Sequence, residues 1–366
     1  MLKFGLTHSV AVTRRMAPAG VLAGALALAM PAHALLIVPT FDASITGSPN
    51  AAAIEGSINT AIATIDGLYN NSISVPVDFT YKPVSGNDLL GTNQFYAAVG
   101  YSTYIGLLTN DAAANPANTI LPTALSNLST GNNASGSQQM ALSSALYAML
   151  TGTAAPSIGS GQAPVININS NQTFGYTQPV SSGVYDLTGG LEHELDEVLG
   201  GGGAGSTLNA IGGSCTTNPG GFFCNKYGPL DLYRYSAFDT PSFSATSENN
   251  PISYFSVDSG VTNIVYFNQN QGGDMADFAG NVADGGTNQC GTVLAGGLGG
   301  QLIQNAFNCT GPDEAYTTAS PEYVMEESIG WDPTSAPEPM SLACILPGAL
   351  ALAGVRRRRR RNAKAG

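Results

Sequence analysis

Basic side chains are scarce in this 366-residue sequence, and most of them lie near its two ends. Of the 13 lysines and arginines, only Lys82, Lys226 and Arg234 fall within residues 35–335. Every acidic residue except Glu338 lies in that same range. A protein that neutralises phosphates needs a basic patch, so we exclude nucleic acid as a partner. Divalent cations are natural partners for such an acidic chain, although solubility alone would also explain the charge.

Histidine is equally rare, with only three copies, at His8, His33 and His193. The first two lie in residues 1–34, which have the layout of a secretory signal peptide: basic residues, then an apolar run, then Ala-His-Ala. We expect cleavage after Ala34. The apolar run is short for a membrane anchor, which is the alternative interpretation. The mature chain then keeps a single histidine.

Cysteine is also infrequent, and the five copies suit an exported protein. Cys215 and Cys224 form one sequence-local pair, and Cys290 and Cys309 form another. We expect both pairs to be disulfides. A cysteine-based metal site is the weaker alternative, because neither spacing matches a zinc knuckle. The fifth copy, Cys344, lies in the C-terminal apolar run.

The apolar pattern predicts an α+β fold with helices packed on one sheet. Isoleucines at helical spacing follow Asn50 and predict a helix, and residues 73–81 alternate as a half-buried strand. Pro76 indicates an edge position for that strand. Residues 110–136 read mostly as loop and residues 138–150 as helix. We expect an ectodomain over residues 35–335, with an α/β part to residue 203 and a loop-rich part from residue 204.

The stretch from Asp186 to Gly203 reads DLTGGLEHELDEVLGGGG and predicts a helix. Its leucines recur every fourth residue, Asp186 is a candidate N-cap, and the glycine run supplies the stop. On such a helix His193 and Glu197 share one face, one turn apart. Glycines border this face on both sides, at residues 189, 190 and 200. We therefore expect room for a ligand to approach closely.

The local string HExxE resembles the HExxH helix of zinc peptidases, in which two histidines bind the metal and the glutamate activates a water. The resemblance makes His193 the first ligand, Glu194 the general base and Glu197 the second ligand. A carboxylate can ligate zinc, but it also makes manganese or calcium less unlikely than two histidines would. The alternative is a buried helix with a solvated acidic face.

Candidates for a third ligand lie further along the chain. Asp231 is one, although with Arg234 it could instead form a local ion pair of little consequence. Tyr233 or Tyr235 could donate a hydrogen bond to a substrate oxyanion. Residues 272–286 carry three aspartates among glycines, but without the spacing of an EF-hand or a nonapeptide repeat. We expect an ordinary turn there.

The C-terminal tail has three parts: Pro337-Glu338-Pro339, the mainly apolar residues 340–355, and six arginines at residues 356–361. This layout over residues 336–366 resembles the PEP-CTERM sorting signal of Gram-negative bacteria. The resemblance implies that an exosortase recognises and removes the tail after a transient association with the inner membrane. The protein would then reach the cell surface or the extracellular matrix. A simple tail anchor is the alternative.

The rest of the chain is similar to a group of PEP-CTERM-associated metalloproteases of the HExxE type, which are described as metzincin-like. The similarity is carried by VPTFD, HELDEVLG, LDLYRYSA, YFSVDSG and QGGDMADF. It implies a metzincin-like α+β fold with a twisted mixed sheet, and an exported zinc-dependent endopeptidase acting on proteins or peptides. One departure is Gly203, because the metzincin pattern has His or Asp six residues after the second ligand. The alternatives are a non-catalytic surface or matrix protein with a degenerate helix, and a calcium-dependent binding module.

Overall fold

The computed structural model describes residues 35–86, 88–128, 139–155, 163–244, 253–270, 272–279 and 301–334. The expected signal peptide, Cys290, Cys344 and the expected sorting tail lie outside these ranges. Within them, no helix combines the length and the apolar character that a bilayer crossing requires.

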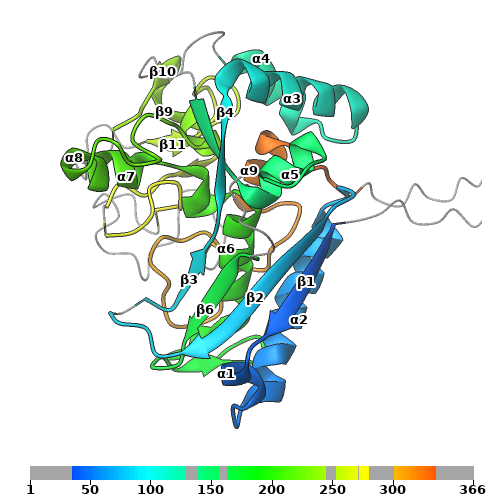
Figure 1. Ribbon diagram of the computed structural model, residues 1–366, viewed down its shortest axis with the longest axis vertical. Coiled ribbons are helices and arrows are strands. Elements are labelled where there is room, and N and C mark those ends of the chain that lie inside the picture. The colour runs from blue at the N-terminus through cyan, green and yellow to red at the C-terminus, as the bar shows by residue number, and fades with distance from the viewer. Residues whose placement is uncertain are drawn as a thin grey trace, which may run out of the picture. The chain divides into compact units, whose positions relative to one another are not determined.

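A four-stranded sheet organises the N-terminal half (Figure 1). Its strands are β1 (Leu36–Phe41), β2 (Ser74–Lys82), β6 (Val165–Asn169) and β3 (Leu90–Asn93), in the order β1-β2-β6-β3. The first three are parallel, whereas β3 runs antiparallel to β6. The sheet is therefore mixed, and the expected α+β class is confirmed.

Strand β2 is not the edge strand that Pro76 suggested, because it lies between β1 and β6. The carbonyls of Ile73 and Phe79 accept hydrogen bonds from β1 and from the residue that follows it. In β2 the backbone N–H and C=O groups of odd-numbered residues therefore point toward β1, and those of even-numbered residues point toward β6. The N–H of Asp78 accordingly donates to the carbonyl of Pro164, just before β6. Pairing with β6 begins only at Asp78. Pro76 thus precedes the β6 ladder, and its missing N–H interrupts no hydrogen bond.

Two long helices lie behind the sheet and pack against each other (Figure 1). Helix α2 (Ala51–Leu68) buries the expected isoleucine stripe, and helix α6 (Leu187–Leu199) carries the HExxE string. A short helix, α1 (Ala43–Thr46), follows β1. Helix α9 (Pro321–Ile329) packs on α6. The indole N–H of Trp331, just after α9, donates to the carbonyl of Leu199 and fixes the end of α6.

Two expectations for the middle of the chain were wrong. The supposed loop contains the end of α3 (Tyr101–Ala114) and all of α4 (Ile120–Asn127). The supposed helix over residues 138–150 begins instead as β5 (Gln139–Ser143), which pairs with β4 (Tyr96–Gly100), and only then becomes α5 (Ser144–Thr151). Helices α3 and α4 separate β5 from its partner along the chain, so local periodicity could not reveal the strand.

The C-terminal half consists mainly of loops, short helices and short strands. A second sheet has the order β10-β9-β11-β12, and a two-stranded sheet joins β7 (Phe174–Gly175) to β8 (Tyr185–Asp186). The strands of the second sheet are β9 (Arg234–Ala237), β10 (Thr240–Pro241), β11 (Tyr254–Phe255) and β12 (Val265–Tyr266). The helical turns are η1 (Gly202–Gly205), α7 (Leu208–Gly212), α8 (Ser214–Thr217) and η2 (Pro229–Tyr233).

Disulfide bonding agrees with the first expected pair. Cys215 and Cys224 are joined, with Cα atoms 5.2 Å apart, and staple the loop that contains α8. Cys309 is also disulfide-bonded, and its expected partner Cys290 lies outside the described ranges.

Candidate metal centre

Helix α6 forms as its sequence predicts. The side chain of Asp186 accepts hydrogen bonds from the backbone N–H groups of Thr188 and Gly189 at the N-terminus. Gly200 ends the helix in the left-handed conformation, at φ 109°. Of the 13 helical residues, every one except His193 is buried. The imidazole therefore lies where the helix meets an opening.

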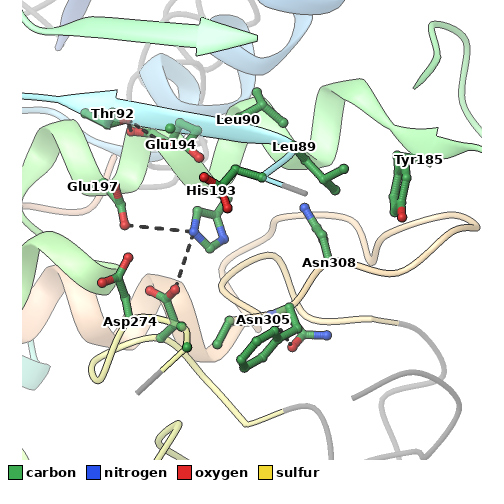
Figure 2. A pocket seen from close by; sticks show the side chains of 17 residues that line it. Leu89, Leu90, Thr92, Tyr185, His193, Glu194, Glu197, Asp274, Asn305 and Asn308 are labelled. Carbon is green, nitrogen blue, oxygen red and sulfur yellow. Dashed lines mark hydrogen bonds and ion pairs between the residues drawn. The ribbon is translucent and has the colours of Figure 1, made fainter. Parts of the chain in front are cut away.

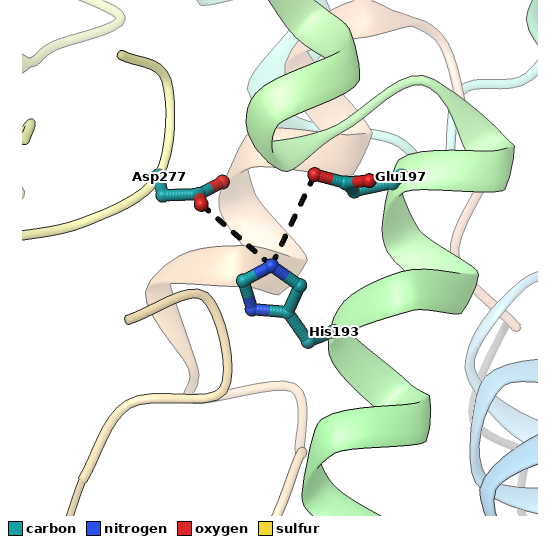
Figure 3. Close-up of side chains that lie close together, drawn as sticks. All are labelled: His193, Glu197 and Asp277. Atoms are coloured by element: carbon teal, nitrogen blue, oxygen red, sulfur yellow. Dashed lines mark ion pairs between the residues drawn. The ribbon is translucent and has the colours of Figure 1, made fainter. Parts of the chain in front are cut away.

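Three side chains meet at this opening: His193 and Glu197 of α6, and Asp277 of the segment over residues 272–279 (Figure 3). Nε2 of His193 lies 3.9 Å from Oε1 of Glu197 and 3.6 Å from Oδ2 of Asp277. All three ligand atoms lie within 4.8 Å of one another. We call this group the triad. It could hold a metal ion.

A backbone carbonyl orients the imidazole of His193. Nδ1 lies 2.9 Å from the carbonyl oxygen of Ile303, and because a carbonyl can only accept, Nδ1 carries the hydrogen. Nε2 then presents its lone pair to the two carboxylates. Burial lowers the pKa of His193 to about 4, and the hydrogen bond to Ile303 only partly opposes this shift. The ring is therefore neutral at physiological pH, which is the form that binds a metal.

No lysine or arginine of the described ranges forms an ion pair with the two carboxylates of the triad. Burial raises the pKa of both Glu197 and Asp277 well above the usual range, and neighbouring carboxylates raise it further. Asp277 is 2 % exposed, and its Oδ1 has no hydrogen-bond partner. Buried carboxylates of this kind are expected to be paired or to coordinate a metal. The chemistry of the triad therefore fits a divalent cation.

The separations within the triad are short enough for its three side chains to contact one metal ion. Neighbouring ligand atoms around a tetrahedral zinc ion lie roughly 3.4 Å apart when each bond is about 2.1 Å long. The separations of 3.6 and 3.9 Å from Nε2 to the carboxylate oxygens are close to that value. Calcium prefers six to eight oxygen ligands, whereas one of these three ligands is a nitrogen.

Glu194 lies in the same pocket and makes a different contact. Its Oε2 accepts a hydrogen bond of 2.5 Å from the hydroxyl of Thr92 on β3. Burial raises the pKa of Glu194 to about 7, Thr92 lowers it, and Asp274 and Asp88 raise it. A carboxyl group with such a pKa is suited to accept and return a proton near neutral pH.

The pocket has a volume of about 670 Å³. Residues 89–92, including Thr92 of β3, lie on one side of it, and Asp274 and Asn305 lie on the other (Figure 2). His193, Glu194, Glu197 and Asp277 all line it. A substrate in this space would contact the triad and Glu194 together.

The structure puts Asp277, and not Asp231, in the third position of the triad. The buried carboxylate of Asp231 accepts hydrogen bonds from the hydroxyl of Ser206 and from the backbone N–H groups of Thr207 and Gly228. It therefore ties η2 to the chain that follows η1. Tyr233, one of the candidate oxyanion donors, is buried and donates to the carbonyl of Ser328, and neither Tyr233 nor Tyr235 lines the pocket.

Arg234 has a function that the sequence did not reveal. Its buried guanidinium donates to the carbonyls of Met275 and Asn268, on the segment that leads to Asp277. Asn209 of α7 holds the same segment, donating to Gly273 and accepting from the N–H of Met275. These contacts bring Asp277 to α6. The only sequence feature that points to Asp277 is the cluster of three aspartates in residues 272–286. The expectation of an ordinary turn there misses its place beside α6.

The glycines around α6 allow close packing, but with other parts of the protein. A Cβ atom at Gly190 would lie 2.8 Å from Leu90, and one at Gly189 would clash with Asp313. A Cβ atom at Gly203 would lie 2.5 Å from Oε1 of Glu197 and 2.6 Å from Cβ of Asp274. The position six residues after Glu197 therefore does face the site. The side chain of Asp274, on a different segment, occupies that space.

Comparison with known proteins finds no match to this chain among protein families, curated proteins or solved structures. Its function therefore has to be inferred from its residues and their geometry.

Proposed function

We propose that this protein is an exported, zinc-dependent endopeptidase whose metal is held by His193, Glu197 and Asp277. The observation that carries the proposal is the meeting of a neutral imidazole, two buried carboxylates and a separate glutamate in one pocket. Structural zinc sites are closed by four protein ligands, whereas catalytic sites have three and an open position. Three ligands beside a pocket of about 670 Å³ favour the catalytic class.

The residues of the chain have distinct parts in this proposal. Bound zinc would supply a Lewis acid that polarises a peptide carbonyl and lowers the pKa of water. Glu194 accepts the proton of the attacking water, so that hydroxide adds to the carbonyl carbon, and returns the proton to the leaving amine nitrogen. Thr92 occupies Oε2 of Glu194, so we assign the transferred proton to Oε1. Ile303 keeps Nε2 of His193 directed at the metal.

The wider identity of the protein is also a proposal. A mixed sheet whose antiparallel strand β3 lies beside a helix carrying HExxE supports a metzincin-like arrangement. The proposed export, and sorting by an exosortase to the cell surface or matrix, is supported only by the sequence of residues 1–34 and 336–366.

A second candidate function, a non-catalytic protein with a structural metal, is favoured by one observation. The triad joins α6 to residues 272–279, so a cation there would also fasten the C-terminal half to the helix. The two candidates agree on metal binding and differ on Glu194, which is not a member of the triad.

The experiment measures metal content and cleavage of casein by the purified mature protein and three variants. We expect about one zinc ion per chain, which Glu197→Ala removes. Glu194→Gln keeps the zinc and loses cleavage by roughly 10²- to 10⁴-fold. Glu55→Gln, on α2 and outside the pocket, is the control and leaves both unchanged. Equal cleavage by wild type and Glu194→Gln would refute the peptidase.

A further inference from the structure

The pocket beside the triad is lined by several acidic side chains and, among the described residues, by no lysine or arginine. Five carboxylates line it, those of Asp88, Glu194, Glu197, Asp274 and Asp277. A cleft lined by one sign of charge concentrates its field and attracts ligands of the opposite charge.

The basic residues of the described chain are committed elsewhere. Arg234 is buried and donates to backbone carbonyls, and Lys226 donates to the carbonyl of Phe222 and lies over that ring, 4.3 Å from its centroid. Lys82 is on β2 and does not line the pocket. A cation that balances this pocket therefore has to come from outside the described part of the chain.

A metal ion in the triad would not balance the whole pocket, because Asp88 and Asp274 are not members of the triad. Asp88 precedes β3, and Asp274 lies three residues before Asp277; both side chains are exposed. Desolvation by the pocket walls raises the pKa of Asp274 although part of its side chain reaches solvent, and the nearby charge of Asp88 raises this pKa further, so the two carboxylates lie close together. The buried Oδ1 of Asp277, which belongs to the triad and lines the same pocket, also has no hydrogen-bond partner among the described residues.

We infer that Asp88 and Asp274 select substrates with a lysine or arginine side chain next to the bond that is cleaved; this inference rests on the proposed peptidase function. The half-buried Leu89 and Leu90, which line the pocket beside Asp88, suit the methylene stem of such a side chain. Long basic side chains bury their stems on apolar surface while the charged group reaches a polar partner. The carboxylates of Asp88 and Asp274 supply that partner.

The test separates binding from cleavage. Fluorescent peptides that differ at one position, carrying lysine, norleucine or glutamate, are titrated by anisotropy against the zinc-loaded Glu194→Gln variant, and the wild type is assayed for their cleavage. We expect the lysine peptide to bind at least ten-fold more tightly than the norleucine peptide, and the glutamate peptide most weakly. The preference should shrink as salt is raised, because exposed charges are screened.

Two variants assign the preference to residues. In the Glu194→Gln background, Asp88→Asn and Asp274→Asn should each reduce the lysine-over-norleucine ratio by several-fold and leave binding of the norleucine peptide unchanged. Asp239→Asn is the matched control: Asp239 is an exposed aspartate outside this pocket, and at φ 49° its backbone tolerates asparagine. Thermal unfolding confirms that each variant is folded.

The outcomes are distinct. Equal binding of the three peptides, or a lysine preference that survives both substitutions, overturns the inference. Calcium affinity that falls in both variants without any change in peptide binding also overturns it, in favour of a second metal site. Cleavage by the wild type without a charge preference refutes the inference and leaves the peptidase. Tight binding of the lysine peptide without cleavage supports the charge selection and refutes the peptidase.

Discussion

Asp277 and Asp231 are both buried aspartates of the C-terminal half, but their surroundings differ. Asp277 presents one oxygen to His193 and leaves the other without a hydrogen-bond partner, whereas Asp231 accepts hydrogen bonds from three residues. A carboxylate with free oxygens is available to a cation. One that is saturated by backbone N–H groups is a structural element.

Substitution of the two aspartates should therefore separate metal binding from stability. Asp277→Asn should weaken zinc binding by well over ten-fold, because it removes a charged ligand. Asp231→Asn should leave zinc binding intact and lower the free energy of unfolding by about 1–3 kcal/mol, because it weakens buried hydrogen bonds. Chelator competition measures the first quantity and denaturant unfolding the second. Loss of zinc by Asp231→Asn alone would contradict this assignment.

The proximity of His193 and Glu197 could be predicted from the sequence, whereas the approach of Asp277 to them could not. His193 and Glu197 follow from one-turn spacing on a single helix, and the triad contains both. Asp277 is distant from Glu197 in the sequence and reaches it through tertiary contacts of its segment, among them those made by Arg234 and Asn209. No local sequence pattern encodes that approach. The sequence instead favours Asp231 as the third ligand, because it lies close to Arg234.

At the level of elements, α9 holds the imidazole of α6 through an intervening loop. Glu322 of α9 accepts the N–H of Gln304 at 2.9 Å. The side chain of Gln304 donates to the carbonyl of His193 at 2.8 Å, and the neighbouring carbonyl of Ile303 accepts from Nδ1. Residues that orient a metal-binding histidine affect affinity although they do not touch the ion.

We therefore expect Glu322→Ala to weaken zinc binding by about 10- to 100-fold. Glu322→Gln keeps an acceptor oxygen and should restore most of the affinity. Glu327→Gln, on the same helix but paired with Tyr323, is the control and should leave the affinity unchanged. Chelator competition at fixed pH measures all four proteins. If Glu322→Ala bound zinc as tightly as Glu327→Gln, α9 would have no part in positioning the histidine.

The turn after α6 packs against Glu197 of the triad, so a substitution in it should affect metal binding. Gly203→Ala places a Cβ atom 2.5 Å from Oε1 of Glu197, so either the carboxylate or the turn has to move. We expect zinc affinity to fall at least ten-fold in this variant. Gly67→Ala, on α2 with nothing within 4 Å of the added atom, should instead stabilise the protein by about 0.5–1 kcal/mol. Unchanged zinc affinity in Gly203→Ala would show that the turn adapts.

Elements with strong local signals were predicted and those defined by distant partners were not. Helix α6 has its N-cap, leucine stripe and glycine stop in one continuous stretch. Its two ends therefore lie where the sequence predicts them. Strand β5 has an apolar sequence that also suits a helix, and its pairing with β4 decides the outcome. Pro76 indicates an edge strand, and this expectation was wrong, because β2 is internal and Pro76 lies before its pairing with β6 begins.

For the whole molecule, burial of carboxyl groups predicts that stability falls as pH rises. Burial raises the pKa of Asp66 and Asp111 to about 6 and that of Asp332 to about 7. The folded state then binds more protons than the unfolded state between pH 4 and 7, so the free energy of unfolding decreases through that range. Because solvent reaches all three groups, each contributes on the order of 1 kcal/mol.

The melting temperature, measured in chelator to exclude metal effects, should therefore be higher at pH 5 than at pH 8. Asp66→Asn should flatten part of this dependence, since asparagine can still accept the N–H of Ile37 without becoming charged. A melting temperature that rises from pH 5 to pH 8 would contradict the sign of these shifts.

The acidic composition was plain from the sequence, but the placement of the acids was not. A count of aspartates and glutamates suggests a solvated surface, whereas many of them are buried on and around α6 and α9, among them Glu192, Asp196, Glu322 and Glu326. Burial depends on which helices pack together, which is a property of the completed fold.

The division of the triad between α6 and a segment much later in the chain also bears on the order of events during synthesis. A nascent chain that has emerged only as far as Glu197 carries two ligands and no site. The third lies on a segment that side chains of α7 and β9 hold in place, so the complete triad needs these elements as well as α6. Capture of a cation by all three ligands would thus require a polypeptide synthesised at least as far as Asp277.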